Sequence, residues 1–482
     1  MGLITTIKRW IEMIFKSQAE KDFKIDVIES PVMEAITQKC ANIYRGTPPW
    51  VDAEDGIKTI NFSKSVCSET ARLATLAIGI RVDGSARAEW LQKKIDTMYS
   101  QIRTWVEYGC AYGTVFIKPN GTGFDHFTPL DVLLVDCDNQ EIRGIIFKDQ
   151  YTQGDKTYTR LEYHRFVDSV VNGVEVSPYY ISNRAYVSDS ADSIGKPISL
   201  SKTKWADLME ETPPIMKANG ESLDGPMFGV FRTPQANNVD QNTILGLPIY
   251  AEAIEELKDL DVAYSRNAGE IKDSQKIILA DDRLLMPDGT PIHAQTPEGL
   301  ARRRNDMHLP HYVKNVYGND QKEFYQEINP QLNTDVRLTG INALLSQLGY
   351  KCGFSNGYFV FNEKTGMVTA TQVEADDRRT IQLIKDVRDK LQTCMDGAVY
   401  ALSVYADLYG LAPVGTYKVT YDFGDITYNY QEDKATWWNY VVQRKVPAWK
   451  YFVKFEGMTE SEAKAMVKEA EPDEKTGLFE EE

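Results

Sequence analysis

The sequence predicts an α+β fold in which helices pack on a meandering antiparallel sheet. Three observations support this prediction. Apolar residues recur at helical spacing in roughly the first hundred residues and again after residue 248. Between these parts, short runs rich in β-branched and aromatic residues are joined by Asn, Asp and Gly turns. The 482 residues, 42% hydrophobic and 26% charged, suffice for about two to four compact units with an ordinary globular composition.

An amphipathic helix is predicted within residues 1–30. Apolar residues recur at helical spacing from Leu3 to Phe15, with Lys8, Arg9 and Lys16 between them. We favour packing of this helix on the protein's own body or on a neighbouring subunit, although a basic amphipathic helix can also lie on a membrane. No run of eighteen or more apolar residues occurs, so we expect no transmembrane helix and no membrane partner.

The next part, residues 31–247, is predicted to be a unit of helices and a sheet. Helices are expected over Pro31 to Tyr44, Asn61 to Ile80 and Arg87 to Tyr108. The expected strands are Ala111 to Lys118, a second strand after the turn Asn120 to Gly123, Val132 to Val135, Ile142 to Lys148, Tyr158 to Phe166 and Val174 to Ile181. Residues 188–240 are rich in turn formers and show little periodicity.

Two helices that can lie side by side are predicted next, over residues 248–275 and 333–350. Pro248 suits the first turn of the first helix. In the second helix, apolar residues from Leu338 to Leu348 share one face. The turn-rich residues 276–332, with a strand expected at Lys276 to Ala280, form a small α/β insert between the two helices.

The last third begins with a glycine- and aromatic-rich segment, residues 351–368. A helix of about 38 residues, or roughly 57 Å, then begins near Thr369, with Gly397 as a candidate kink. A strand is expected over Val414 to Phe423, at the end of this part, residues 369–426. Residues 427–482 return to helix, with a capping box at Thr459 and Glu462, and end in an acidic tail that we expect to be disordered.

Motifs of catalysis and of metal binding are absent from the sequence. It has no GxxxxGK[S/T] phosphate loop, no HExxH and no GxSxG, and its five histidines lack the spacing of a metal site. The six cysteines lie far apart without a CxxC pair, which favours reduced thiols. Asp136 and Asp138 favour a hairpin turn over a cation site. We therefore expect no enzyme, metal or cofactor; an active site built from scattered residues is the alternative.

The net charge of -16 argues against a protein that coats nucleic acid, since such proteins carry a basic footprint. It is compatible with a passage that lets DNA slide, because an acidic wall repels phosphates. The alternative is that the charge only keeps the protein soluble. The one compact basic run, Arg302, Arg303 and Arg304, is either a solvated loop or a contact for an acidic partner or phosphates.

Five sequence features follow one another in a characteristic order between Asn333 and Val387. They are a helix with Ile341-Asn342 and Leu345, then Gly353-Phe354-Ser355, a glycine and aromatic loop, the helix start Thr369 to Val373, and Lys385. Weaker matches are Glu162-Tyr163-His164, Asp422 to Asp425 and Thr459 to Ala463. In order and spacing the chain resembles the portal proteins of tailed phages, of the long-tailed siphophage-like branch. The resemblance covers most of the chain and is strongest from Gly246 to Phe423.

The resemblance implies a ring, usually of twelve copies, at one vertex of the virion capsid, assembled in the host cytoplasm. Such a ring conducts double-stranded DNA during packaging and ejection. The implied partners are the terminase large subunit, a head-completion adaptor, and the major capsid and scaffolding proteins. The implied parts are a wing (31–247), a helical stem (248–275 and 333–350), a clip (276–332), a tunnel loop (351–368), a long kinked helix with a strand that closes the wing (369–426), and a helical crown with an acidic tail (427–482).

The resemblance also implies roles for particular residues. DNA-facing residues of the tunnel loop would be Lys351, Phe354, Asn356, Tyr358, Asn362 and Lys364. The two lysines are phosphate contacts or solvated side chains, and for the loop aromatics we favour packing against neighbouring loops over contact with DNA. Arg302, Arg303 and Arg304 would lie in the clip, where terminase and adaptor dock. The alternative functions are another structural component of a head–tail connector and, less favoured, an enzyme with an unrecognised site.

Overall fold

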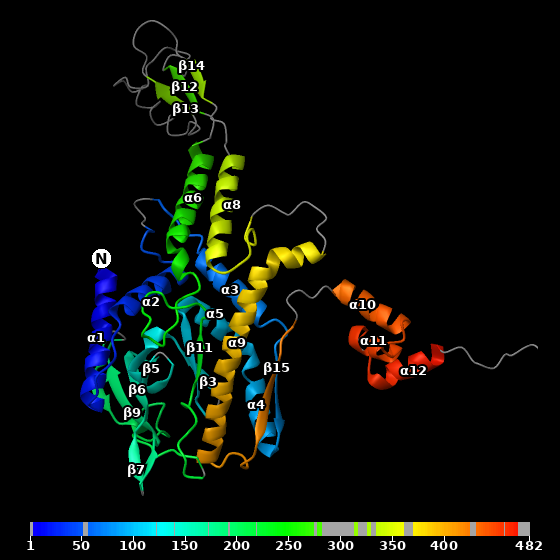
Figure 1. The fold of residues 1–482 in the computed structure, drawn as a ribbon. Helices are drawn as coiled ribbons and strands as arrows, with labels where there is room; N and C mark the ends of the chain where they lie inside the picture. The colour runs from blue at the N-terminus through cyan, green and yellow to red at the C-terminus, as the bar shows by residue number, and fades with distance from the viewer. Residues whose placement is uncertain are drawn as a thin grey trace, which may run out of the picture.

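The computed structural model describes residues 3–51, 56–121, 123–138, 140–171, 173–190, 193–217, 219–273, 277–281, 313–316, 325–328, 334–360, 370–424, 430–456 and 458–470. It is a mixed α+β structure with several small, mostly antiparallel sheets, as the sequence predicts. Figure 1 shows a body of helices and sheets, from which two helices project, and a separate unit of short helices to one side.

The largest sheet is a five-stranded antiparallel meander in the order β10-β9-β6-β5-β4. Its strands are β4 (Val132–Cys137), β5 (Ile142–Gln153), β6 (Lys156–Phe166), β9 (Tyr179–Ser188) and β10 (Lys196–Ile198). Helix α1 (Leu3–Phe23) packs on this sheet through Phe15 and Ala19, which are buried with Tyr163 and Tyr186. This confirms that this part of the amphipathic helix packs on the protein's own body.

The predicted strand from Val174 to Ile181 is wrong as a single element. β8 (Val174–Val176) pairs with β7 (Ser169–Val171) in a small hairpin, and the chain then enters β9. Pro178 lies between β8 and β9, where its missing N–H suits a break in the ladder. At the other predicted hairpin, the Asp138 carboxylate accepts the N–H groups of Gln140 and Glu141, which confirms the turn interpretation.

The main core lies where helices cover a second, three-stranded sheet. The sheet has the order β11-β2-β3, made of β2 (Thr114–Pro119), β3 (Phe124–Phe127) and β11 (Gly229–Arg232). The helices are α2 (Pro31–Tyr44), α3 (Phe62–Ala74), α4 (Ala86–Asp96) and α5 (Tyr99–Tyr112). The prediction for α2 is confirmed at both ends, and so is the second strand after the turn at Asn120.

Two of the predicted helix ranges are wrong. The range Asn61 to Ile80 stops as a helix at Ala74. A turn that contains Ala77, with a left-handed φ of 49°, then leads into β1 (Gly79–Gly84). The range Arg87 to Tyr108 is two helices, α4 and α5, separated at Thr97 and Met98. The apolar periodicity continues across both breaks, so periodicity alone did not reveal them.

Helix α9 (Ala370–Leu408) crosses the whole body and confirms the predicted long helix. Gly397 does not mark its bend, which Figure 1 places in the yellow, N-terminal part of the helix. A Cβ at Gly397 would lie 3.0 Å from the Cα of Gly229, and a Cβ at Gly229 would lie 2.0 Å from the carbonyl oxygen of Cys394. The two glycines therefore let strand β11 approach the helix backbone.

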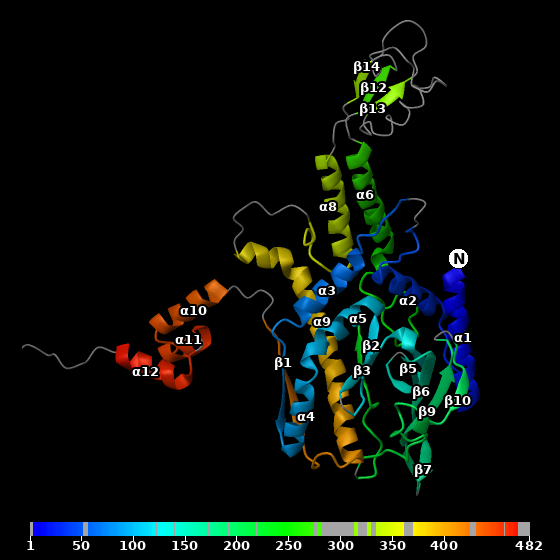
Figure 2. The same ribbon diagram turned by 180° about the vertical axis from the view of Figure 1, so that it is seen from behind.

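Two buried arginines attach α9 to the rest of the body. Arg388 donates to the carbonyl oxygens of Leu73 and Ala74, the last residues of α3, at 3.1 Å each. Arg87 of α4 donates to the carbonyl oxygens of Ser403 and Pro413 at 2.6 and 2.8 Å. The chain then returns as β15 (Tyr417–Asp422), which pairs with β1 beside α4, as Figure 2 shows from behind.

The projecting helices are α6 (Ile254–Asp273) and α8 (Thr334–Lys351), which contact one another along their length. At their far end lies a three-stranded sheet of β12 (Ile277–Asp281), β13 (Val313–Val316) and β14 (Tyr325–Ile328), with β12 in the middle. The predicted side-by-side helices, and the strand that follows the first of them, are confirmed. The separate unit consists of α10 (Tyr430–Val442), α11 (Ala448–Phe455) and α12 (Glu460–Ala470), and α12 begins with the predicted capping box.

Candidate functional site: the chain between helices α8 and α9

The chain turns back into the core directly after α8. Gly353 adopts φ of 92°, a left-handed conformation that glycine takes without steric strain. Its position is also crowded, since a Cβ there would lie 3.2 Å from the Leu383 side chain of α9. The sequence Cys352-Gly353-Phe354 thus ends α8 and brings the chain onto α9.

Ser355 and Thr380 join the two helices at this point. The Ser355 N–H donates to the Thr380 hydroxyl at 2.9 Å, and the Thr380 N–H donates to the Ser355 hydroxyl at 3.2 Å. The two hydroxyl groups are 3.0 Å apart, and both residues are buried. Thr380 belongs to the N-terminal part of α9, and a side chain that bonds to an N–H inside a helix is a known cause of bending.

Arg379, beside Thr380, makes a second connection. Its guanidinium group lies 3.7 Å from the centre of the Tyr350 ring and donates to the Tyr350 carbonyl oxygen at 2.9 Å. That carbonyl belongs to the last turn of α8, where backbone acceptors lack helical partners. The end of α8 and the N-terminal part of α9 are therefore held by a buried hydroxyl pair and by an arginine.

Phe354, which was predicted to face DNA, lies in the core of its own chain. Its side chain is fully buried, because it packs against the rings of Tyr358 and Phe359 at 5.0 and 4.8 Å. Phe359 in turn packs on Phe62 of α3 at 5.0 Å. These aromatics belong to the core of their own chain, which neither of the two predicted kinds of contact anticipated.

Tyr358 is half-buried and its hydroxyl is occupied. It donates to the Glu69 carboxylate at 2.5 Å, and Arg72 donates twice to the same carboxylate. Burial and the bond to Glu69 raise the pKa of the Tyr358 hydroxyl above its ordinary value. The Tyr358 side chain therefore serves to attach this segment to α3.

Lys351 pairs with Glu256 of α6 at 2.6 Å and donates to the Glu252 carbonyl oxygen at 3.2 Å. It holds α8 to α6, so the structure gives it an intramolecular partner in place of a phosphate. Asn356 is exposed. Asn362 and Lys364, like Arg302, Arg303 and Arg304, lie outside the described residues, so their roles stay predictions.

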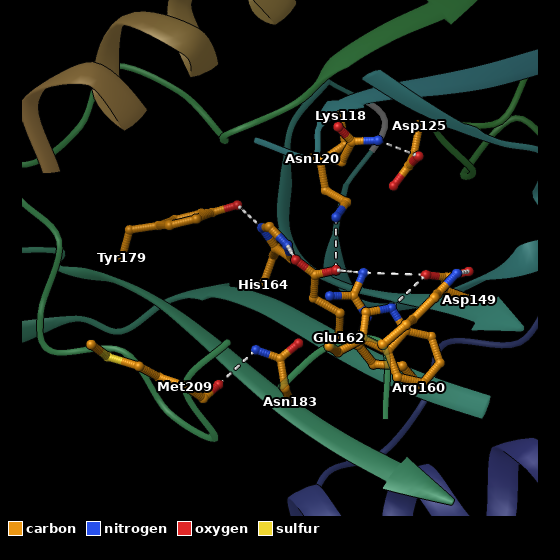
Figure 3. Close-up of polar contacts among 12 residues, drawn as sticks. Lys118, Asn120, Asp125, Asp149, Arg160, Glu162, His164, Tyr179, Asn183 and Met209 are labelled. Atoms are coloured by element: carbon orange, nitrogen blue, oxygen red, sulfur yellow. Dashed lines mark hydrogen bonds and ion pairs between the residues drawn. The ribbon is translucent and has the colours of Figure 1, made fainter. Parts of the chain in front are cut away.

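A buried charged network, which the sequence did not reveal as a cluster, lies between β2 and the five-stranded sheet (Figure 3). The Glu162 carboxylate of β6 receives Lys118 of β2 at 2.7 Å and Arg160 at 2.7 Å. His164 bonds to the other Glu162 oxygen at 3.0 Å and to the Tyr179 hydroxyl at 2.8 Å. Glu162 and His164 alternate with Tyr163 on β6, so they share one face of the strand.

Burial and charge decide the protonation of this network. Burial alone would raise the pKa of Glu162, but Lys118 and Arg160 outweigh it and hold that pKa well below the ordinary value. Burial lowers the pKa of His164, which favours the neutral ring. The side chains of Lys118, Arg160, Glu162 and His164 are each at most 5% exposed. A nearby pocket of about 420 Å³ is lined by Trp105, His126 and Asp149 but not by these four residues.

This network resembles a catalytic constellation in its residue types, but its four side chains are almost fully buried. Arg160 also pairs with Asp149 at 3.5 Å, so that two cations face two carboxylates, and the hydrogen bonds tie β2 to the middle of the large sheet. We therefore interpret the network as a structural element that joins the two sheets. Within the described residues, no group of three or more His, Cys, Asp or Glu side chains has metal-site geometry, and none of the described helices is long and apolar enough to cross a membrane.

Comparison with known proteins adds no family assignment. A scan against protein-family models found no match, and a search of curated proteins found none either. The portal resemblance thus rests on the order and spacing of the sequence features alone.

Proposed function

We propose that the chain is a portal-type subunit, which assembles into a ring of about twelve copies and conducts double-stranded DNA. The observation that supports this most is the pair α6 and α8, which projects from an α+β body and carries a small sheet at its far end (Figure 1). In the proposal the pair is the stem, the small sheet belongs to the clip, the body is the wing, and α10 to α12 are the crown.

The packing of this pair suits the wall of a channel. The helices have 20 and 18 residues, or about 30 and 27 Å at 1.5 Å per residue. Leu260 of α6 and Ile341, Leu345 and Leu348 of α8 are buried in the main core cluster. With the Lys351–Glu256 pair at the base, the two helices behave as one stiff unit in this proposal.

The connection from α8 to α9 suits the role of an anchored element next to the channel. Ser355, directly after α8, and Arg379 and Thr380, inside the N-terminal part of α9, hold the two helices together. That Asn362 and Lys364 of this chain segment face DNA stays a prediction. Of the residues first expected to do so, Asn356 is exposed, whereas Phe354 and Tyr358 stabilise the anchor.

The proposed partners follow from the same function and remain proposals: terminase large subunit and head-completion adaptor at the clip, and major capsid and scaffolding proteins around the ring. The proposed location is the portal vertex of the virion, with assembly in the host cytoplasm.

Light scattering on the purified full chain tests the proposal. The expected particle has a mass near twelve times 54.7 kDa, and neighbouring ring sizes would still agree with the proposal. A chain that stays monomeric at micromolar concentration, in low and in moderate salt, would contradict it.

A further inference from the structure

The C-terminal helical unit carries a basic stretch that the proposed function does not use. From Lys434 to Lys454 the sequence contains no acidic residue, whereas the basic residues are Lys434, Arg444, Lys445, Lys450 and Lys454. The chain as a whole has 70 acidic and 54 basic residues. A positive segment in such an acidic protein identifies a local surface for an anion, because the rest of the chain repels one.

The structure exposes three of these cations close together in the chain. Arg444 and Lys445 form the turn between α10 and α11, where their N–H groups donate to the Val441 and Tyr440 carbonyl oxygens at 2.9 Å each. Lys450 follows in the first turn of α11, and all three side chains are exposed. We call Arg444, Lys445 and Lys450 the basic face.

Arg444 occupies a backbone position that glycine would fill with less strain. Its φ is 56°, in the left-handed region that follows many helix C-termini and favours glycine or asparagine. A cation near a helix C-terminus also stabilises the helix dipole, which is the simpler explanation for Arg444 and Lys445. That explanation does not extend to Lys450, which lies in the first turn of the next helix.

The neighbouring lysines lie over aromatic rings. Lys450 is 5.5 Å from the centre of the Trp449 ring, and Lys454 is 4.3 Å from that of Trp437. A cation–π contact leaves the ammonium charge in place, whereas an ion pair would cancel it. Lys434, at the start of this stretch, forms an ion pair with Glu456 at 2.8 Å. The Trp449 ring therefore orders Lys450, whose charge also acts on Glu460 of α12, a carboxylate that is itself paired with Lys464.

We propose that the basic face binds the phosphate backbone of double-stranded DNA, without reading its sequence. The inference rests on the proposed function in naming duplex DNA as the polyanion. Phosphate binding requires clustered, accessible cations, since it is driven by the release of counterions. Tyr451 and Phe455 of α11 are buried, whereas Trp438, Tyr440 and Val442 of α10 are exposed, so binding to anionic vesicles is measured as the competing outcome.

The test uses the full-length protein and a fluorescently labelled duplex, with anisotropy titrations between about 50 and 200 mM salt. The variant is Arg444→Glu/Lys445→Glu/Lys450→Glu. The control, Lys93→Glu/Lys390→Glu/Lys418→Glu, makes the same charge change at three exposed lysines elsewhere. We expect the variant to bind the duplex at least tenfold more weakly than the wild type. The slope of log affinity against log salt concentration should also fall in magnitude by about 2 to 3. The control should change both quantities far less.

Arg444→Gly separates binding from folding. Glycine suits the left-handed backbone, so the melting temperature should stay equal or rise, whereas duplex affinity should fall about two- to tenfold, as expected for one lost phosphate contact. A fall in melting temperature with unchanged affinity would show that Arg444 is a helix cap and would overturn its part in the basic face.

Three results would overturn the proposal. They are the absence of salt-dependent duplex binding by the wild type, equal binding by the variant and the wild type, and binding of poly-glutamate or anionic vesicles through these residues without binding of the duplex. Particle mass is measured on the same samples. If the protein forms rings and the variant binds the duplex as tightly as the wild type does, only this inference is contradicted. A monomeric wild type contradicts the proposed function.

Discussion

Ser355 and Thr380, 25 residues apart in the chain, each donate a backbone N–H to the other's side-chain hydroxyl. This reciprocal pair is buried where the end of α8 meets the N-terminal part of α9. It fixes how the projecting helix pair is attached to the long helix, so its loss should be felt in the stability of the whole body.

Thr380→Val keeps the shape of the side chain but removes the hydroxyl. The buried Ser355 N–H and hydroxyl then lack this partner, which should lower the free energy of unfolding by about 1–3 kcal/mol. Urea denaturation measures the change. Thr393→Val is the matched control, because Thr393 lies on the same helix with an exposed side chain, and its effect should stay within about 0.5 kcal/mol. Equal effects of the two substitutions would contradict the role of the pair.

Gly397→Ala and Gly340→Ala should change stability in opposite directions. A Cβ at Gly397 meets the Cα of Gly229 at 3.0 Å and the carbonyl oxygen of Phe228 at 3.1 Å, so overpacking should cost about 1–3 kcal/mol. Gly340, inside α8, has no atom within 4 Å of its Cβ position. Alanine there should stabilise by about 0.5–1 kcal/mol. Thermal melts of both variants check this, and a stabilised Gly397→Ala would rule out the close approach.

The sequence predicted α2, the long helix, the meander and the side-by-side helices well, because each has strong periodicity or clear end signals. It missed the breaks at Ala77 and at Thr97–Met98, which interrupt continuous apolar patterns. The resemblance implied a channel-facing Phe354, and the glycine-rich aromatic run did not oppose it, because such a run fits a loop as well as a core. The run itself does not show that Phe62 and Leu383, distant in sequence, surround it.

Contacts between residues that are far apart in the chain could not be predicted from the sequence either. Nothing in the residues around Ser355 names Thr380 as its partner, and the contact between Lys118 and Glu162 depends on how β2 meets β6. Lys351 is a lone lysine in sequence, and its role became clear only from Glu256 on the neighbouring helix.

Glu162→Gln should be among the most destabilising polar substitutions in the body. It removes the carboxylate that balances Lys118 and Arg160, and breaking a buried ion pair from one side costs about 3–5 kcal/mol near neutral pH. Urea denaturation measures the loss, with Glu175→Gln on an exposed strand as control. A loss no larger than that of the control would show that the network contributes little.

The pH dependence of the same variant has a defined sign. The folded-state pKa of Glu162 lies well below the ordinary 4.5, so its stabilisation is fully present above about pH 4.5 and is lost as the pH falls below it. Glutamine does not titrate, so the stability gap between wild type and Glu162→Gln should narrow below that pH. A gap that stays constant down to the acid limit of folding would contradict the assigned charge state.

Lys351→Met tests whether this lysine acts within the chain. It leaves the largely buried Glu256 carboxylate without its cation and should lower the free energy of unfolding by about 1–3 kcal/mol. Adding Glu256→Gln should recover part of the loss, because the carboxylate charge is removed too. A double-mutant cycle by urea denaturation measures the coupling energy between Lys351 and Glu256. A coupling energy of zero would show that Lys351 is a solvated lysine without a stabilising partner.

Cryo-electron microscopy of the assembled particle tests the central claim most directly. The portal proposal predicts a closed ring of about twelve copies around an open channel, with α6 and α8 of every copy along the wall. A monomer, or a closed particle in which these two helices lie away from any channel, would contradict it.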